Sequence, residues 1–165
     1  MVDSHFHLWR RRDAKQAGVL AAPYLQRDVP WRAYAAATRG LPLEGCVAVQ
    51  VNDFVDGRPE ARYLAGVARQ HPQLRAVVAW AQLEAAGAGQ QLQELAALPL
   101  VAGVRRSTQH EADPGLAGSA AFVAGARRLA PRRWVCEVCV KWFQLEGVVR
   151  LAEACPRGSL EVTQG

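Results

Sequence analysis

Short apolar runs alternate along the chain with longer stretches that are rich in alanine and leucine. Each run holds about five to eight residues, which is a usual length for a buried strand. The runs cover residues Met1–His7, Gly45–Asn52, Leu74–Trp80, Leu100–Arg105, Trp134–Lys141 and, more weakly, Ser159–Thr163. The stretches between them contain helix formers and cover residues Trp31–Arg39, Pro59–Gln70, Gly89–Ala97, Ser119–Ala130 and Leu145–Ala154. The pattern therefore predicts alternating strands and helices.

This alternation predicts an α/β fold with parallel strands joined by helical crossovers, as an open doubly wound sheet or as a (β/α) barrel. The runs at Gly45–Asn52 and Leu74–Trp80 are almost continuously apolar, as expected of strands covered on both faces. Ligands of such folds bind at the loops that follow the strands. The longest of these loops are predicted at Leu8–Pro30 and Arg106–Gly118.

The composition is that of an ordinary globular protein, with 165 residues of which 50% are apolar. This length predicts one domain that covers residues 1–165. No apolar run approaches the roughly 18–20 residues that span a bilayer, and the first residues do not resemble a secretory signal. We therefore expect no membrane association and a cytoplasmic location.

The net charge of +5 comes mostly from arginine. Clusters occur at Arg10–Arg12, Arg105–Arg106, Arg127–Arg128 and Arg132–Arg133, without interleaved aromatic residues. Such dispersed clusters do not favour a nucleic-acid partner, whereas a small anionic ligand fits them. The chain also lacks the glycine-rich dinucleotide and P-loop motifs and the nucleophile elbow of serine hydrolases, so we expect no nucleotide cofactor.

Cys136 and Cys139 form a C-x-x-C pair, which on a turn would suggest zinc binding or redox chemistry. Here the pair falls in a predicted strand. Residues three apart on a strand point to opposite faces, so the two thiols cannot share a metal. We expect these cysteines, Cys46 and Cys155 to be reduced thiols.

The most informative segment is Asp3-Ser4-His5-Phe6-His7-Leu8-Trp9. If it opens with a strand, His5 and His7 project to one face, close enough for two imidazoles to bind one divalent cation. Asp3 has the same parity and would be placed to orient a ring. A catalytic zinc typically has three protein ligands, so the alternative is a hydrogen-bonded pair at a strand end.

The pattern D-x-H-x-H-x-W at the start of a β/α chain resembles the amidohydrolase-related family, which includes sugar-acid lactonases and pyrone-dicarboxylate lactonase. Later segments resemble further blocks of that family in order. They are Gly45–Asn52 (family pattern G-x-x-x-V-Q-V), Ala76–Leu83 (G-V-V-G-W-V-D-L), Leu100–Arg106 (L-V-G-V-R-H) with Gln109 to Pro114, and Val138–Leu145 with Cys155-Pro156. The resemblance covers nearly the whole chain and aligns it with the first five to six strands of the family barrel.

The resemblance implies a partial TIM-type (β/α) barrel of about five to six parallel strands with helical crossovers. It implies a hydrolase of a lactone or related carbonyl compound, in which an activated water attacks the carbonyl. Some members of the family use a divalent metal. In such a member, His5 and His7 would bind that metal, zinc or manganese. Arg105 would lie at the end of the fourth strand and pair with a substrate carboxylate; an ordinary surface ion pair is the alternative.

Two departures from the family pattern bear on activity. Trp142-Phe143 replace the histidine that follows the fifth strand, and the sixth strand reads Leu160-Glu161-Val162-Thr163 in place of an aspartate and histidine. The last strands of the barrel, including the eighth with the family's general base, are missing. We therefore also consider a catalytically inactive truncated barrel that self-associates through open sheet edges, as a homo-oligomer or interaction module.

Overall fold

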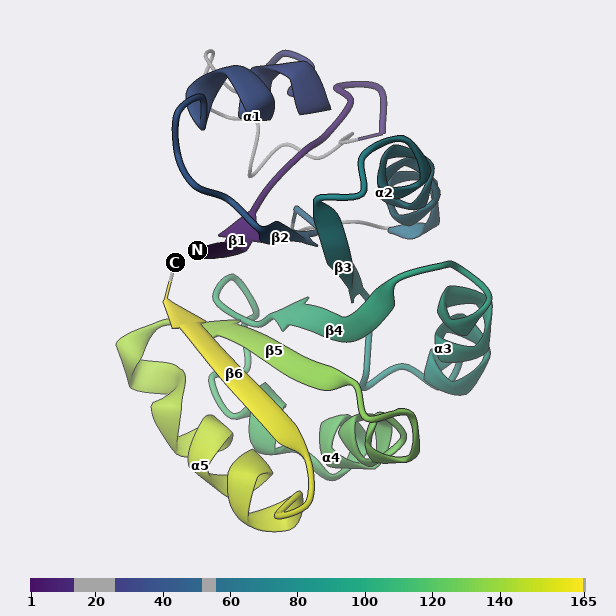
Figure 1. Cartoon of the computed structure of the whole chain (residues 1–165). Helices are drawn as coiled ribbons and strands as arrows, with labels where there is room; N and C mark the ends of the chain where they lie inside the picture. Colours follow the sequence, from purple (N-terminus) through teal and green to yellow (C-terminus); the bar gives the residue numbers. More distant parts are fainter. Residues whose placement is uncertain (14–25, 52–55, 165) are drawn as a thin grey trace. The chain divides into compact units, whose positions relative to one another are not determined.

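The computed structural model describes residues 1–13, 26–51 and 56–164, and Figure 1 labels its helices and strands. The strands are β1 (Val2–Phe6), β2 (Gly45–Val49), β3 (Leu74–Trp80), β4 (Val101–Ser107), β5 (Val135–Val140) and β6 (Ser159–Gln164). The α-helices are α1 (Trp31–Ala37), α2 (Arg58–Gln70), α3 (Ala88–Ala96), α4 (Ala120–Arg127) and α5 (Leu145–Ala154). Short 3-10 helices are η2 (Leu116–Gly118), η3 (Ala130–Arg132) and η4 (Trp142–Gln144).

The six strands follow one another in the sheet in chain order, and the pairings of β1 with β2, β2 with β3, β4 with β5 and β5 with β6 are parallel. Helical crossovers join them. This is the predicted α/β class, a partial (β/α) barrel of six parallel strands. The predicted bounds of β3 and α5 are those observed, and each of the remaining ends agrees or differs by one to three residues; the predicted end of the second run, Asn52, lies outside the described residues.

The chain divides into two compact units. Unit 1 comprises residues Met1–Trp80 and Leu95–Val101, and unit 2 comprises residues Ala81–Glu94 and Ala102–Gly165. None of the helices in the described ranges is long and apolar enough to cross a membrane.

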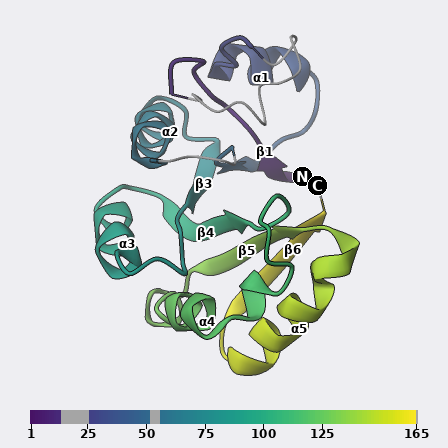
Figure 2. The same cartoon turned by 180° about the vertical axis from the view of Figure 1, so that it is seen from behind.

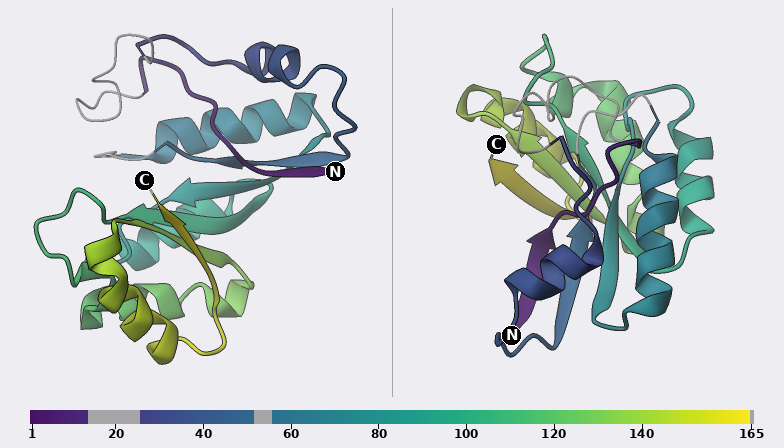
Figure 3. Two further views of the ribbon diagram at one scale, coloured as in Figure 1. Left: turned by 90° about the vertical axis from the view of Figure 1, so that its left-hand side faces the viewer. Right: turned by 90° about the horizontal axis from the view of Figure 1, so that it is seen from above.

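Unit 1 packs β1, β2 and β3 against α2, which runs along the strands in both views of Figure 3. Its buried core contains Phe6, Leu8, Cys46, Ala48, Leu64, Val67, Ala68, Leu74 and Val77. Pro59 occupies the first turn of α2, where its missing N–H costs no helical hydrogen bond. Phe6 also stacks on Tyr34 of α1, with 3.9 Å between ring centroids. One face of the three strands is thus covered by helices.

Gln50, directly after β2, ties three segments of unit 1 together. Its buried side-chain oxygen accepts from the backbone N–H of Trp80 at 2.8 Å, and its amide nitrogen donates to the carbonyl of Gly57. Two residues into α2, the fully buried Glu60 accepts from the N–H of Val51 at 2.9 Å. These contacts fix the chain where β2 ends.

Unit 2 packs α4 and α5 on one face of β5 and β6, as Figure 2 shows from behind. Cys136 of β5 and Leu160 of β6 face these helices, because they line a small cavity together with Leu129 and Leu151. Helix α4 begins at Ser119, whose hydroxyl accepts from the N–H of Phe122. Since side chains alternate along a strand, Glu137 and Glu161 point to the face opposite the helices.

Candidate functional site

His5 and His7 lie side by side at the carboxyl end of β1. Their ring centroids are 5.0 Å apart and the rings meet edge to face at 87°. Phe6 and Leu8 alternate with them and enter the helix-covered core, so the imidazoles are on the opposite face of the strand. Both side chains are partly buried. This is the shared face that the H-x-H spacing predicts.

A hydrogen bond to β2 sets the orientation of the His7 ring. Its Nδ1 lies 2.7 Å from the carbonyl oxygen of Val49. A carbonyl only accepts, so Nδ1 carries the proton, and in the neutral ring the lone pair is on Nε2. Histidines that bind metals typically have this arrangement, with one nitrogen donating to a carbonyl or carboxylate and the other coordinating.

The Asp3 carboxylate forms hydrogen bonds to α1 and to its own strand, and its expected role toward the imidazoles stays a prediction. The register between β1 and β2 shifts between Asp3 and Phe6. The Asp3 carboxylate accepts from the Tyr34 hydroxyl at 3.0 Å and from the backbone N–H of His5 at 3.1 Å. Burial raises the pKa of Tyr34, and the hydrogen bond to Asp3 acts in the same direction. Asp3 therefore joins β1 to α1.

Arg105 lies on β4 in unit 2, one residue before the predicted loop, and is buried. Its Nε is 3.3 Å from Oε1 of Glu137, the residue paired with it in register on β5. The ion pair considered as an alternative is therefore present, but it is buried and not on the surface, because the Glu137 side chain has no exposed area. The role of Arg105 toward a substrate stays a prediction.

The face of unit 2 opposite α4 and α5 carries two rows of polar side chains across its strands. Strand register aligns Arg105, Glu137 and Glu161 in one row, and Ser107, Cys139 and Thr163 in the next. The rows are connected, since the Thr163 hydroxyl donates to Oε1 of Glu137 at 3.3 Å. Burial raises the pKa of Glu137, and Glu161 adds to the rise, whereas Arg105 and the Thr163 hydrogen bond oppose it.

Several buried polar atoms on this face and beside it have no hydrogen-bond partner among the described residues. They are Oε2 of Glu137, Oγ of Ser107 and Oγ1 of Thr108. Buried polar atoms nearly always have partners, and those that lack them cluster where a ligand or water binds. The polar face of unit 2 is therefore a candidate ligand-contacting surface, which we call the β4–β6 polar face.

Sequence reasoning missed Glu137. The signal was present, because Glu137 is the single charged residue in the run Val135–Val140, and a charge inside a buried strand requires a partner or a function. Arg105, the partner, lies 32 residues earlier, and only strand register brings the two together.

Next to Arg105, the buried Arg106 anchors the loops of unit 2. Its guanidinium donates to Glu84 through Nε and Nη2, to Glu111 at 2.7 Å, and to the carbonyl of Ser107. These bonds join the segment after β3 to the loop after β4. Glu111, which the sequence places in a polar loop, thus has a structural contact.

The two cysteines of the C-x-x-C pair do not share a site. Cys136 faces the helix-side cavity, while the Sγ of Cys139 lies 3.7 Å from the side-chain oxygen of Gln109. Burial raises the pKa of Cys136 to about 12, so this thiol is unreactive. All four cysteines are free thiols, as expected.

A family model described as amidohydrolase matches residues 2–162. The chain belongs to the amidohydrolase family. The resemblance proposed from the sequence is confirmed, and the family match covers the imidazole pair and the β4–β6 polar face except Thr163.

Individual amidohydrolases extend well beyond this chain. It is 32% identical, over 154 residues, to L-fucono-1,5-lactonase of Burkholderia multivorans, covering 89% of this chain and 49% of that protein. An amidohydrolase structure from B. multivorans with bound zinc is 27% identical, with a TM-score of 0.81 over 98% of this chain and 56% of its own. An amidohydrolase 2 from Bifidobacterium longum subsp. infantis is 25% identical, with a TM-score of 0.72. The match covers 96% of this chain and 59% of that structure's chain. The chain thus spans about half the length of these relatives.

Proposed function

We propose that this chain is the part of a lactonase-type amidohydrolase that holds a divalent metal on His5 and His7 and acts on a lactone or a related carbonyl compound. The observation that carries the proposal is the imidazole pair, in which the Val49 carbonyl leaves Nε2 of His7 as the basic nitrogen. The relationship to L-fucono-1,5-lactonase supports a lactone as the substrate.

The donor set suits zinc. Neutral imidazole is a preferred zinc ligand, and the pair would supply two of the typical three protein ligands. A structural relative contains bound zinc, which supports zinc over manganese. When bound, such a metal polarises a carbonyl and lowers the pKa of a coordinated water.

We also propose that Arg105 binds an anionic group of the substrate. A guanidinium in a buried position pairs strongly with a carboxylate or with negative charge that develops on a carbonyl oxygen. Glu137 holds Arg105 in place, and Thr163 holds Glu137. Oε2 of Glu137 and the hydroxyl of Ser107 can exchange hydrogen bonds with ligand hydroxyls, which favours a polyhydroxylated lactone.

The test is hydrolysis of a panel of sugar 1,4- and 1,5-lactones by the 165-residue chain with added zinc, measured as acid release. We expect activity toward at least one lactone, with at least a hundredfold loss in His5→Ala and in His7→Ala. His110→Ala, at an exposed loop histidine, is the matched control and keeps full activity. Absence of turnover across the panel, or equal loss in all three variants, contradicts the proposal.

One observation favours the alternative of a self-associating module. Large apolar side chains are exposed around the carboxyl ends of β5 and β6, including Trp142 at 75% and Val162 at 46%. Val140, Lys141, Leu145 and Thr163 complete a cavity of about 220 Å³ there. Strand β6 also ends the sheet order. Light scattering after size exclusion distinguishes this alternative, since Trp142→Ser should convert a dimer into a monomer.

A further inference from the structure

Unit 1 contains a groove that the proposed function does not use. It is a groove of about 510 Å³ between α1 and α2. Its chemically distinctive lining residues are Arg10, Trp31, Arg32, Arg62, Tyr63 and His71. We call it the α1/α2 groove.

The groove lies on the helix side of β1, away from the imidazole pair. Trp31 lines the groove and packs edge to face on Phe6, with 6.2 Å between the ring centroids. Phe6 belongs to the core of unit 1. His5 and His7 alternate with Phe6 and face the other way. The groove and the imidazole pair are therefore separate sites.

Flat aromatic surfaces form part of the wall. Trp31 and His71 stack at 4.5 Å between centroids and 12° between planes, so the indole is held rigid against the end of α2. Arg10 lies over the ring of Tyr63, with its guanidinium carbon 4.7 Å from the centroid. These contacts cover one face of each ring, so a planar ligand would pack against the remaining parts of Trp31 and Tyr63 that line the groove.

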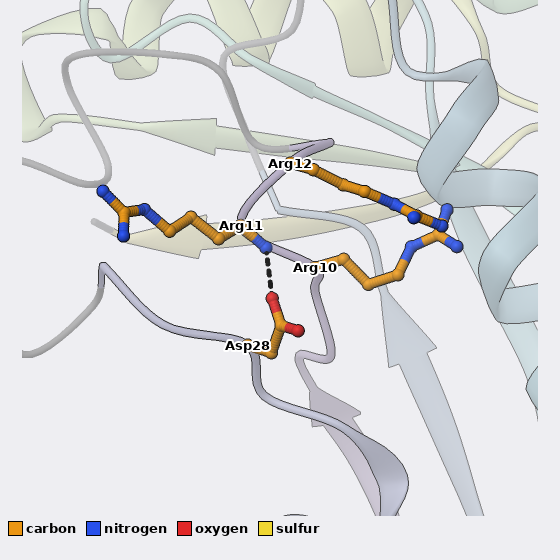
Figure 4. A pocket seen from close by; sticks show the side chains of 4 residues that line it. All are labelled: Arg10, Arg11, Arg12 and Asp28. Atoms are coloured by element: carbon orange, nitrogen blue, oxygen red, sulfur yellow. Dashed lines mark hydrogen bonds between the residues drawn. The ribbon is translucent and has the colours of Figure 1, made fainter.

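The groove has an excess of positive charge. Arg10 shares the Asp13 carboxylate with Arg12, so one negative charge faces two guanidinium groups. Figure 4 draws a different pocket, lined by Arg10, Arg11, Arg12 and Asp28, which shares Arg10 with the groove; there the side chains of Arg10 and Arg12 extend in the same direction and Arg11 in the opposite one. Arg32 and Arg62 are exposed, and among the described residues neither lies within ion-pair distance of a carboxylate, although the charge of Arg62 contributes to lowering the pKa of Asp56. The arginines therefore complement an anion.

We propose that the α1/α2 groove binds a planar organic anion, namely an aromatic ring that carries a carboxylate. The ring would lie against Trp31 and Tyr63, and the carboxylate would pair with Arg32 and Arg62, whose planar forks match it in geometry. A volume of about 510 Å³ accommodates a single-ring ligand with solvent. Since the groove is separate from the imidazole pair, such a ligand would not be the substrate of the proposed hydrolase.

The proposal is tested by isothermal titration of the full chain with benzoate, benzamide and inorganic phosphate. Benzoate has both the ring and the charge, benzamide lacks the charge, and phosphate lacks the ring. We expect benzoate to bind at least tenfold more tightly than either, with affinity that falls as salt increases. Equal affinity for benzoate and benzamide, or for benzoate and phosphate, would overturn the proposal.

Variants locate the binding site. The double variant Arg32→Gln and Arg62→Gln removes two exposed charges that make no ion pair, so the fold is retained, and we expect at least tenfold weaker benzoate binding. Arg69→Gln is the matched control, because Arg69 is an exposed arginine of α2 outside the groove, and it should bind benzoate as the original chain does. Unchanged binding by the double variant, or the same loss in the control, would show that the groove is not the site.

Discussion

The guanidinium of Arg105 lies 3.3 Å from the carboxylate of Glu137, and strand register places the two directly opposite each other on β4 and β5. Both side chains are buried. A charge buried at this depth is costly without its counter-charge. The pair therefore couples the stability of unit 2 to the orientation of the residue that we expect to contact substrate.

Replacing Glu137 with leucine should lower the free energy of unfolding by about 3–5 kcal/mol, because it removes a buried negative charge that pairs with the Arg105 guanidinium. The double variant Arg105→Met and Glu137→Leu should recover most of that loss, since an apolar pair of similar volume replaces the ion pair. Denaturant unfolding measures both. A loss below about 1 kcal/mol in the single variant would mean that the pair contributes little.

Glu60 should make unit 1 less stable as the pH rises. Burial raises its pKa to about 8, while the hydrogen bond from Val51 only partly offsets the effect. The native chain keeps this proton up to about pH 8, whereas the unfolded chain releases it near the ordinary value of 4.5. The contribution of Glu60 to the free energy of unfolding therefore decreases as the pH rises from about 4.5 to about 8. Above about pH 8 this contribution no longer changes with pH.

Glu60→Gln should remove most of this slope and should be more stable than the original chain at pH 9. Denaturant midpoints at several pH values measure the effect. Glu153→Gln, at an exposed position on α5, is the control and should keep the slope. A slope that persists in Glu60→Gln would exclude Glu60 as its source.

Two glycines should respond to alanine in opposite directions. At Gly125 of α4, an added Cβ would lie 2.0 Å from the carbonyl oxygen of Leu83, so Gly125→Ala forces α4 away from the segment after β3. At Gly66 of α2, a Cβ meets nothing within 4 Å. We expect Gly125→Ala to lower the melting temperature strongly, with a cost of about 3 kcal/mol, and Gly66→Ala to stabilise by about 0.5–1 kcal/mol. Equal effects would contradict the packing of α4.

The strand and helix pattern was readable from the sequence because buried strands and amphipathic helices have different hydrophobic periods. The same logic placed His5 and His7 on one face. It did not predict the hydrogen bond from Tyr34 to Asp3, since periodicity does not encode contacts between β1 and α1. It also missed Glu137, because a buried carboxylate is explained only by Arg105 on a neighbouring strand.

The zinc content of the purified chain tests the central claim most directly. We predict about one equivalent of zinc per chain by elemental analysis after dialysis against zinc and then buffer, and loss of that zinc in the double variant His5→Ala and His7→Ala, with His110→Ala unchanged. A chain that retains no zinc, or a double variant that retains as much as the original, would contradict the assignment of the imidazole pair as a metal site.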